Sequence, residues 1–461
     1  MTGAPECDGR RRLLRGVLLF PFLGTARRLV EAPRATPSGQ AASEHTMNTI
    51  AEGYVRLVLA VGQHDADYVD AYYGPADWRA DAARDATPLP EIRARASVLL
   101  EALGPRATVS TRPGAPEPGM DHLRRAYLQH QLSALVARTE ILEGRRLSFD
   151  EESRALYDAV APTHAASYFE DVARRLDARL PGSGPIHERY ATFRRAFVIP
   201  EDRVDAVFRA AIGGARSRTL THVELPPNES FKVEYVTDKP WSGYNWYKGG
   251  FESVIQVNLD LPVYVDRAVD LACHEGYPGH HVYNVLLERD LSRRRGWVEF
   301  MVYPLFSPQS LIAEGTANYG IDVAFPAADR LDFERDTVFP LAGLDPRRAS
   351  EYYDVQGLMD QLSYAGNEAA RGYLDGAMDR AAAEAWLVRY ALSTPAQASQ
   401  RVRFFDRYRS YVINYNLGRD LVRAHIEARG GRAERPDVRW REFVALLASP
   451  RLPSGLVARR P

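Results

Sequence analysis

Lysine and cysteine are scarce in this chain of 461 residues, and long apolar runs are missing. The only cysteines are Cys7 and Cys273, too few for a small fold held together by disulfides. The only lysines, Lys232, Lys239 and Lys248, lie close together. A formal net charge of −1 excludes a strongly basic nucleic-acid-binding surface. No segment approaches the ~20 consecutive apolar residues of a membrane-spanning helix. We therefore expect neither nucleic acid nor a membrane as a partner.

The first 46 residues differ in composition from the rest of the chain. A basic stretch at residues 10–12 precedes a short apolar patch at residues 17–23, and sequence rich in Pro, Ser, Gly and Ala follows. No small-x-small cleavage site follows the patch, so residues 1–46 are interpreted as a disordered or mis-started leader, with a signal peptide as the alternative. We expect a cytoplasmic protein, or a secreted one if the leader is a signal peptide.

From residue 47 onward the sequence predicts a mainly α fold. Apolar residues recur at helical spacing, and Pro and Gly separate the segments. We expect a helical N-terminal region at 47–225 and a region at 226–461 that carries the metal site, the two forming one continuous domain. Within the second region, helices are expected again from residue 263, including a long one at 348–379.

Strand-like sequence occurs just before the most informative motif of the chain. Residues 231–236 alternate polar and apolar side chains, and residues 254–259 are rich in β-branched residues. Both segments predict strands of one small sheet, joined by an aromatic, turn-rich loop at 241–247. The edge of the strand at 254–259 could pair with an extended peptide.

Three of the eleven histidines lie within eight residues, at His274, His280 and His281. Glu275 follows the first of them. Two imidazoles that bind a metal ion, with a glutamate that accepts a proton from the metal-bound water, are the pattern of zinc hydrolases. Cys273 precedes the first candidate ligand, but its side chain would point about 100° away on a helix, so we expect a packing thiol.

The spacing of these histidines does not fit a regular helix. His280 and His281 follow His274 by six and seven residues, about 9 and 10.5 Å along a helix axis, too far to share one ion. Pro278 and Gly279 lie between them and predict a distortion that brings one of the two histidines back toward His274.

A third ligand is needed to complete a catalytic metal site. Glu314 lies in an apolar segment of small residues, where an unpaired carboxylate would be costly to bury. The alternative is an acid that stabilises a helix N-terminus. Asp322, two turns later, is a candidate to hold a histidine N–H from behind.

Other candidates come from the chemistry of such a site. A donor for a developing oxyanion could be a late Tyr or His, for which Tyr415, Tyr411 and His425 are candidates. An arginine could bind a substrate carboxylate, and Arg409, Arg401 and Arg403 lie nearby in the sequence. The aromatic loop could line the cleft through Tyr244, Tyr247 and Lys248.

The runs His-Glu-x-x-Pro-Gly-His-His at 274–281 and Glu-Gly-x-Ala-x-Tyr at 314–319 resemble a largely bacterial family, domain of unknown function 885. Its members look like helical zinc peptidases of the glutamate-ligand class, zincin-like or carboxypeptidase-like. The resemblance spans about residues 47–453 and is strongest at 232–322. It implies His274 and His280 as ligands, Glu275 as base, Glu314 as third ligand, and one Zn²⁺ or another divalent ion.

The resemblance is not complete. The family has tryptophan after the Glu-Gly pair, where this chain has Thr316. The segment 394–397, which also resembles the family, is displaced from Tyr415 in this chain. Tyr319 ends the second run and is a further candidate for substrate binding.

We therefore expect an enzyme, a zinc-dependent hydrolase. A peptidase of the carboxypeptidase or dipeptidase type, acting on short peptides with Glu275 as general base, is favoured. The alternatives are an amidase or deacylase that acts on a non-peptide metabolite, and a non-catalytic protein with a structural metal site.

Overall fold

A computed structural model of the chain describes residues 39–107, 118–239, 241–260 and 262–456. The chain divides into two compact units, Met1–Ser43 and Glu44–Pro461. Residues 1–38 of the expected leader lie outside the described residues. Helix α1 begins at Gly39, eight residues before the predicted start at Met47. The description below concerns the second unit.

The first half of this unit is helical, as the apolar periodicity predicts. Helix α5 shows how local sequence sets a boundary: Ser148 accepts a hydrogen bond from the backbone N–H of Glu151, whose side chain accepts one from Ser148 N–H in return. The elements are α1 (Gly39–Val61), β1 (Val69–Tyr72), α2 (Ala76–Asp85), α3 (Leu89–Leu103), α4 (Met120–Leu142), α5 (Phe149–Tyr157), α6 (Ala166–Asp177), α7 (Ile186–Arg195) and α8 (Val204–Leu220).

A three-stranded sheet precedes the motif, as predicted, but its order differs from the expectation. Strands β2 (Ser230–Val236) and β3 (Gly243–Gly249) flank β4 (Glu252–Asn258), with β2 parallel and β3 antiparallel to it. The segment predicted as a loop is therefore largely strand β3. Its residues Tyr244 and Trp246 pair with Gln256 and Val254 of β4. Since β4 is central and paired on both sides, the expectation that its edge binds a peptide is wrong.

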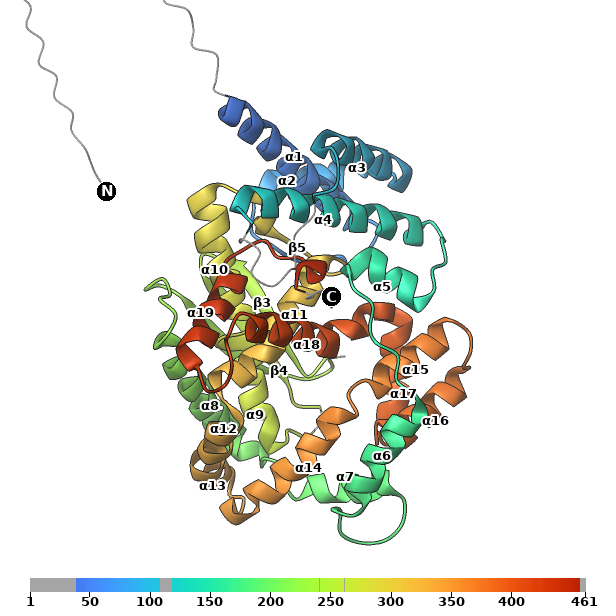
Figure 1. Ribbon diagram of the computed structural model, residues 1–461, viewed down its shortest axis with the longest axis vertical. Coiled ribbons are helices and arrows are strands. Elements are labelled where there is room, and N and C mark those ends of the chain that lie inside the picture. The colour runs from blue at the N-terminus through green and yellow to red at the C-terminus, as the bar shows by residue number, and fades with distance from the viewer. Residues whose placement is uncertain (1–38, 108–117, 240, 261, 457–461) are drawn as a thin grey trace, which may run out of the picture. The chain divides into compact units, whose positions relative to one another are not determined.

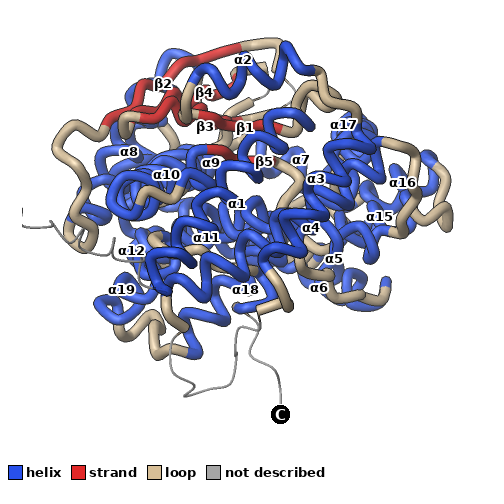
Figure 2. Tube along the Cα trace, turned by 90° about the horizontal axis from the view of Figure 1, so that it is seen from above, coloured by secondary structure: helices blue, strands red, loops and turns tan. Residues whose placement is uncertain are grey.

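A second, two-stranded sheet was not predicted. Strand β1 pairs antiparallel with β5 (Val302–Pro304), which lies more than 200 residues later in the sequence. Such short strands leave little local signal in a sequence. Figure 2 shows the strands gathered on one side of the helical body.

The rest of the unit is helical again. The expected long helix at 348–379 is divided into α14 and α15, because the chain turns at residues 362–364 and Asn416 Nδ2 donates to the carbonyl oxygen of Ser363. The elements are α9 (Val265–Leu271), α10 (His280–Leu286), α11 (Pro308–Ala324), α12 (Ala327–Phe333), α13 (Phe339–Ala342), α14 (Ala349–Gln361), α15 (Ala365–Leu374), α16 (Arg380–Tyr390), α17 (Pro395–Tyr408), α18 (Ile413–Ala428) and α19 (Pro436–Leu447).

Helices α11 and α18 form the centre of the packing and lie side by side in Figure 1. Gly315 and Gly418 allow this close approach, because a Cβ at Gly315 would come within 2.5 Å of the backbone of Gly418. Helix α11 is almost entirely buried. The predicted mainly α fold is thus confirmed, with small sheets. Among the described residues, we find no helix with the length and apolar character that crossing a membrane requires.

Candidate metal centre

The distortion expected between the histidines begins one turn before Pro278. Helix α9 passes into a π-helical turn, η2 (Ala272–Gly276), which carries His274 and Glu275. The chain then leaves the helix, and α10 starts at His280. Gly279 N–H donates to the carbonyl oxygen of Cys273 at 2.9 Å, and a Cβ at this position would overlap the carbonyl oxygen of His274. Glycine is therefore required here by the close approach of the backbone.

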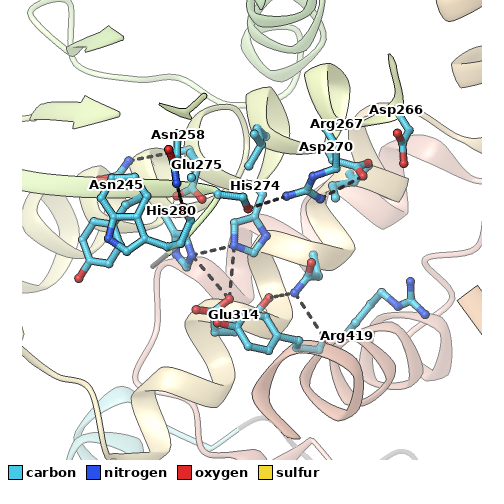
Figure 3. A pocket seen from close by; sticks show the side chains of 18 of the residues that line it. Asn245, Asn258, Asp266, Arg267, Asp270, His274, Glu275, His280, Glu314 and Arg419 are labelled. Atoms are coloured by element: carbon cyan, nitrogen blue, oxygen red, sulfur yellow. Dashed lines mark hydrogen bonds and ion pairs between the residues drawn. The ribbon is translucent and has the colours of Figure 1, made fainter. Parts of the chain in front are cut away.

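This backbone path brings three donor atoms together (Figure 3). The Nε2 atoms of His274 and His280 lie 3.2 Å apart. Glu314 Oε2 lies 3.3 Å from the first nitrogen and 3.9 Å from the second. Ligands at about 2.05 Å around a tetrahedral zinc ion are about 3.3 Å apart. The three side chains have the separation that such an ion needs.

Glu314 is buried and its two oxygens differ. Oε1 accepts a hydrogen bond from Tyr411 Oη at 2.9 Å, whereas Oε2 has no hydrogen-bond partner among the described residues. Burial alone would raise the pKa of Glu314, but hydrogen bonding and the charge of the neighbouring histidines lower it below the usual value. An ionised carboxylate with a buried, unengaged oxygen is costly without a cation, and so the residues fit a metal ion.

The histidines respond to the same surroundings in opposite directions. Burial, reinforced by the nearby His274 and opposed by Glu314, lowers the pKa of His280 to about 4. Burial also disfavours protonation of His274, but the negative charges of Glu314 and Glu275 beside it outweigh this and raise the pKa. His280 is therefore neutral at neutral pH, which is the form that binds a metal ion.

Glu275 is buried beside the three donor atoms. Burial raises its pKa to about 7; His274 opposes this rise and Glu314 adds to it. Its backbone carbonyl accepts a hydrogen bond from Asn245 Nδ2 at 2.7 Å. Gly243 leaves room for the carboxyl group, because a Cβ there would lie 3.2 Å from Glu275 Oε1. Three potential metal-binding side chains next to a carboxyl group whose pKa lies near neutrality could hold an ion and exchange a proton with a bound molecule.

The donor atoms face a cavity of about 1330 Å³. Strand β3 and the segment around β1 form one wall, and helices α14, α17 and α18 contribute others. Four of the predicted tyrosines line this cavity: Tyr244, Tyr247, Tyr411 and Tyr415. The hydroxyl of Tyr247 donates to buried Glu288, so its ring contributes only a surface to the cavity.

His281 turns away from this cavity. Its Nδ1 lies 2.9 Å from Ser253 Oγ, and its Nε2 lies 3.0 Å from Glu229 Oε2. Glu229 also accepts from Tyr277 Oη and from Arg216, both at 2.7 Å. We call these four residues (Arg216, Glu229, Tyr277 and His281) the Glu229 cluster. His281 is not a metal ligand in this arrangement because both of its nitrogens are engaged.

Four other candidates lie away from the donor atoms or are engaged elsewhere, which corrects the expectations for them. Asp322 lines the cavity but pairs with Arg423 at 2.7 Å and holds no histidine. Tyr319 is buried against Phe443. Lys248 lies over the ring of Trp246. Arg409 is bound to buried Glu152 at 2.5 Å and so cannot bind a substrate carboxylate.

Asp70 is a cavity residue that was not among the candidates predicted from the sequence. It lies on β1 and accepts a hydrogen bond from Tyr244 Oη. Burial, followed by the charges of Glu314 and Glu275, raises its pKa to about 8. The pairing of β1 with β5 places this residue at the site, and no local sequence pattern predicts that pairing.

No family model and no curated protein matches this chain. Solved structures similar to this chain include two described as putative lipoproteins. A structure described as a putative lipoprotein from Colwellia psychrerythraea is 15% identical, with a TM-score of 0.51, covering 82% of this chain and 71% of the other. One described as a putative lipoprotein of unknown function from Shewanella oneidensis is 13% identical, with a TM-score of 0.40, covering 87% and 82%.

These comparisons correct the expected function. The structure from Colwellia psychrerythraea is described as a putative lipoprotein and not as a zinc hydrolase, and it gives no support for peptidase or amidase activity. At these identities the likeness concerns the fold alone. We therefore withdraw the assignment of a zinc-dependent peptidase. The resemblance to domain of unknown function 885 stays a prediction.

Proposed function

We propose that the protein binds one divalent transition-metal ion, zinc by preference, through His274, His280 and Glu314. The observation that carries this proposal is the buried Oε2 atom of Glu314, which has no hydrogen-bond partner among the described residues and faces two imidazole nitrogens. Two nitrogens and one carboxylate oxygen are a donor set that suits zinc, and the cavity leaves a fourth position open.

Zinc titration of the full-length, metal-free protein by calorimetry tests this proposal. We expect one ion per chain, and loss of that binding in His274→Ala and Glu314→Gln. His222→Ala is the matched control, because His222 is exposed and stacks on Trp440 away from the site. Wild-type protein that binds no zinc, or His274→Ala protein that binds it with unchanged affinity, would contradict the proposal.

We also propose that the site belongs to an enzyme, because Glu275 lies buried beside the donor atoms with room around its carboxyl group. When bound, the ion supplies Lewis acidity. Glu275 would accept a proton from a group that binds in the open position. Acetohydroxamic acid is a suitable probe, since it binds zinc and gives up a proton.

The matched variant for this second proposal is Glu275→Gln. It should keep the zinc stoichiometry and bind acetohydroxamate at least ~10-fold more weakly, because a charge-assisted hydrogen bond is lost. Equal hydroxamate affinity in the variant and the wild type would refute the role of Glu275. A zincin-like relation of the helices around the metal site also remains a proposal, supported by the placement of the third ligand on α11.

For localisation, the description of a similar structure as a putative lipoprotein favours the secreted alternative over the cytoplasmic expectation. The basic and apolar composition of residues 10–23 is compatible with an export signal. Fractionation of cells that express the full chain with a C-terminal tag tests this. Recovery in the cytoplasmic fraction alone, at full length, would contradict export.

A further inference from the structure

The cavity contains one arginine that differs from the others in its wall. Arg267 lies 3.4 Å from Asp270, Arg330 lies 2.8 Å from Asp270, and Arg419 binds both oxygens of Asp360 at 2.8 Å. Each of these guanidinium groups is neutralised by the protein itself. Arg401 lines the same cavity and has no carboxylate or hydrogen-bond partner among the described residues.

The surroundings of Arg401 hold its side chain without neutralising it. The residue is half-buried on α17, and its guanidinium carbon lies 4.9 Å and 5.7 Å from the ring centres of Phe404 and Phe405. Helix α15 also approaches the group, because a Cβ built at Gly366 would lie 3.8 Å from one of its terminal nitrogens. Aromatic rings stabilise a guanidinium through their faces but leave its N–H donors unused.

Arg401 lines the same cavity as the three proposed metal-binding residues. Tyr415 lines the same cavity and is close enough to both Arg401 and Glu314 to interact electrostatically with each of them. Burial lowers the pKa of Arg401, and Tyr415 is the neighbour that opposes this change. A half-buried cation with free donors, facing the cavity that holds the metal site, is arranged to meet an anion from solution.

We propose that Arg401 binds the carboxylate of a small organic acid whose remaining atoms extend toward the metal centre. This inference rests on the proposed metal site, because it assigns the class of ligand that reaches the ion. A monoanion fits best. One uncompensated cation matches one carboxylate, while the acidic groups of the cavity, Asp70, Glu275 and Glu314, disfavour a multiply charged anion such as phosphate.

The test uses benzoate as probe on the full-length protein, with and without zinc, and ligand-observed NMR to measure its affinity. A carboxylate can also bind zinc directly, so the metal-free arm isolates the contribution of the arginine. We expect Arg401→Gln to weaken benzoate binding at least ~10-fold in both arms, with zinc affinity and melting temperature unchanged. Arg401→Lys, which keeps the charge without the planar fork, should give an intermediate affinity.

Arg403→Gln is the matched control, since Arg403 is exposed on the same helix and, among the described residues, its side chain bonds only Ser399. Benzamide, which lacks the charge, should bind wild-type and Arg401→Gln protein equally. Benzoate binding that is absent from the wild type or equal in Arg401→Gln would overturn the inference. So would binding of inorganic phosphate, but not benzoate, that depends on Arg401. Because zinc affinity is measured separately, failure of the metal site and failure of the carboxylate site are distinguishable.

Discussion

Two neighbouring histidines at the start of α10 face different surroundings. The Nε2 atom of His280 lies 3.2 Å from that of His274 at the wall of the cavity. His281 is fully buried, and Ser253 and Glu229 engage its two nitrogens. Because successive helical side chains point about 100° apart, one turn of helix can serve both surfaces. His280 is only partly buried, so the more deeply buried of the two histidines is not the candidate ligand.

What separates the two sides is whether their polar atoms are satisfied. In the Glu229 cluster both carboxylate oxygens of Glu229 accept hydrogen bonds, from Arg216 on one and from Tyr277 and His281 on the other. In the metal centre Glu314 Oε2 accepts none among the described residues. A satisfied network fixes the position of a segment, whereas an unsatisfied buried donor set is able to bind an ion.

Gly279→Ala should disturb both sides at once and have the largest effect. The new Cβ would overlap the carbonyl oxygens of Cys273 and His274, so the chain between the two histidines must move. We expect a loss of about 2–4 kcal/mol in the free energy of unfolding, together with loss of zinc binding. Urea denaturation and zinc titration measure the two effects.

Gly213→Ala is the control for this change. Gly213 lies in α8, and a Cβ there would meet nothing within 4 Å, so alanine should be neutral or slightly stabilising. If Gly279→Ala were as stable as the wild type and bound zinc normally, the close backbone approach would not matter and the comparison would lose its basis.

Exchange of each histidine for alanine separates the two sides. His280→Ala should lose zinc binding by more than the ~10–100-fold that loss of an outer partner costs, with little change in the stability of the metal-free protein. His281→Ala should have the opposite pattern, with zinc affinity retained and the fold destabilised. We expect a loss of about 1–3 kcal/mol in the free energy of unfolding, because Glu229 and Ser253 lose a buried partner. Calorimetric zinc titration and chemical denaturation of both variants provide the comparison. An equal loss of zinc affinity in both variants would show that the two sides are not distinct.

The features of this site that can be predicted from the sequence are those set by residues close together in the chain. The mainly helical fold, the strands β2 and β4, and the break between His274 and His280 follow from periodicity and from Pro278 and Gly279. These features are set by residues close in the chain. The choice between His280 and His281 is not, because it depends on Glu229, some 50 residues earlier.

The same reason explains why the arginine that faces the cavity and Asp70 could not be identified from the sequence. Nothing in the sequence around Arg409 and Arg401 distinguishes their roles. In the fold, Arg409 pairs with Glu152, whereas Arg401 has no acidic partner among the described residues. Asp70 reaches the cavity only because β1 pairs with β5. Charge pairing between distant elements is decided by tertiary structure, and a single sequence does not contain a local signal for it.

Tyr411→Phe changes the metal side alone and by a smaller amount. It removes the hydroxyl that donates to Glu314 Oε1 at 2.9 Å, which holds the carboxylate in position. We expect a ~10–100-fold loss of zinc affinity with the stoichiometry retained. Tyr408→Phe is the control, since Tyr408 also lines the cavity but makes no hydrogen bond to the three ligands. Unchanged zinc affinity in Tyr411→Phe would remove the positioning role of this hydroxyl.

Glu229→Gln tests the satisfied side through pH and should have the smallest effect. Burial disfavours the charged form of Glu229, but hydrogen bonds from His281, Tyr277 and Arg216 outweigh it and lower its pKa from 4.5 to about 2. A carboxyl group with a lowered pKa in the folded protein stabilises the fold above pH 4.5, and this contribution is lost as the pH falls toward about 2. The metal-free wild type should therefore be more stable than Glu229→Gln near neutrality, by about 1–2 kcal/mol, and the difference should shrink with acidification.

Urea unfolding of the wild type and Glu229→Gln across this pH range measures the difference. Glu101→Gln, a substitution of the same kind at an exposed residue, is the control. A difference that stays constant over this range would mean that the charge of Glu229 contributes nothing, so that the shape of its hydrogen bonds alone holds His281 away from the metal centre.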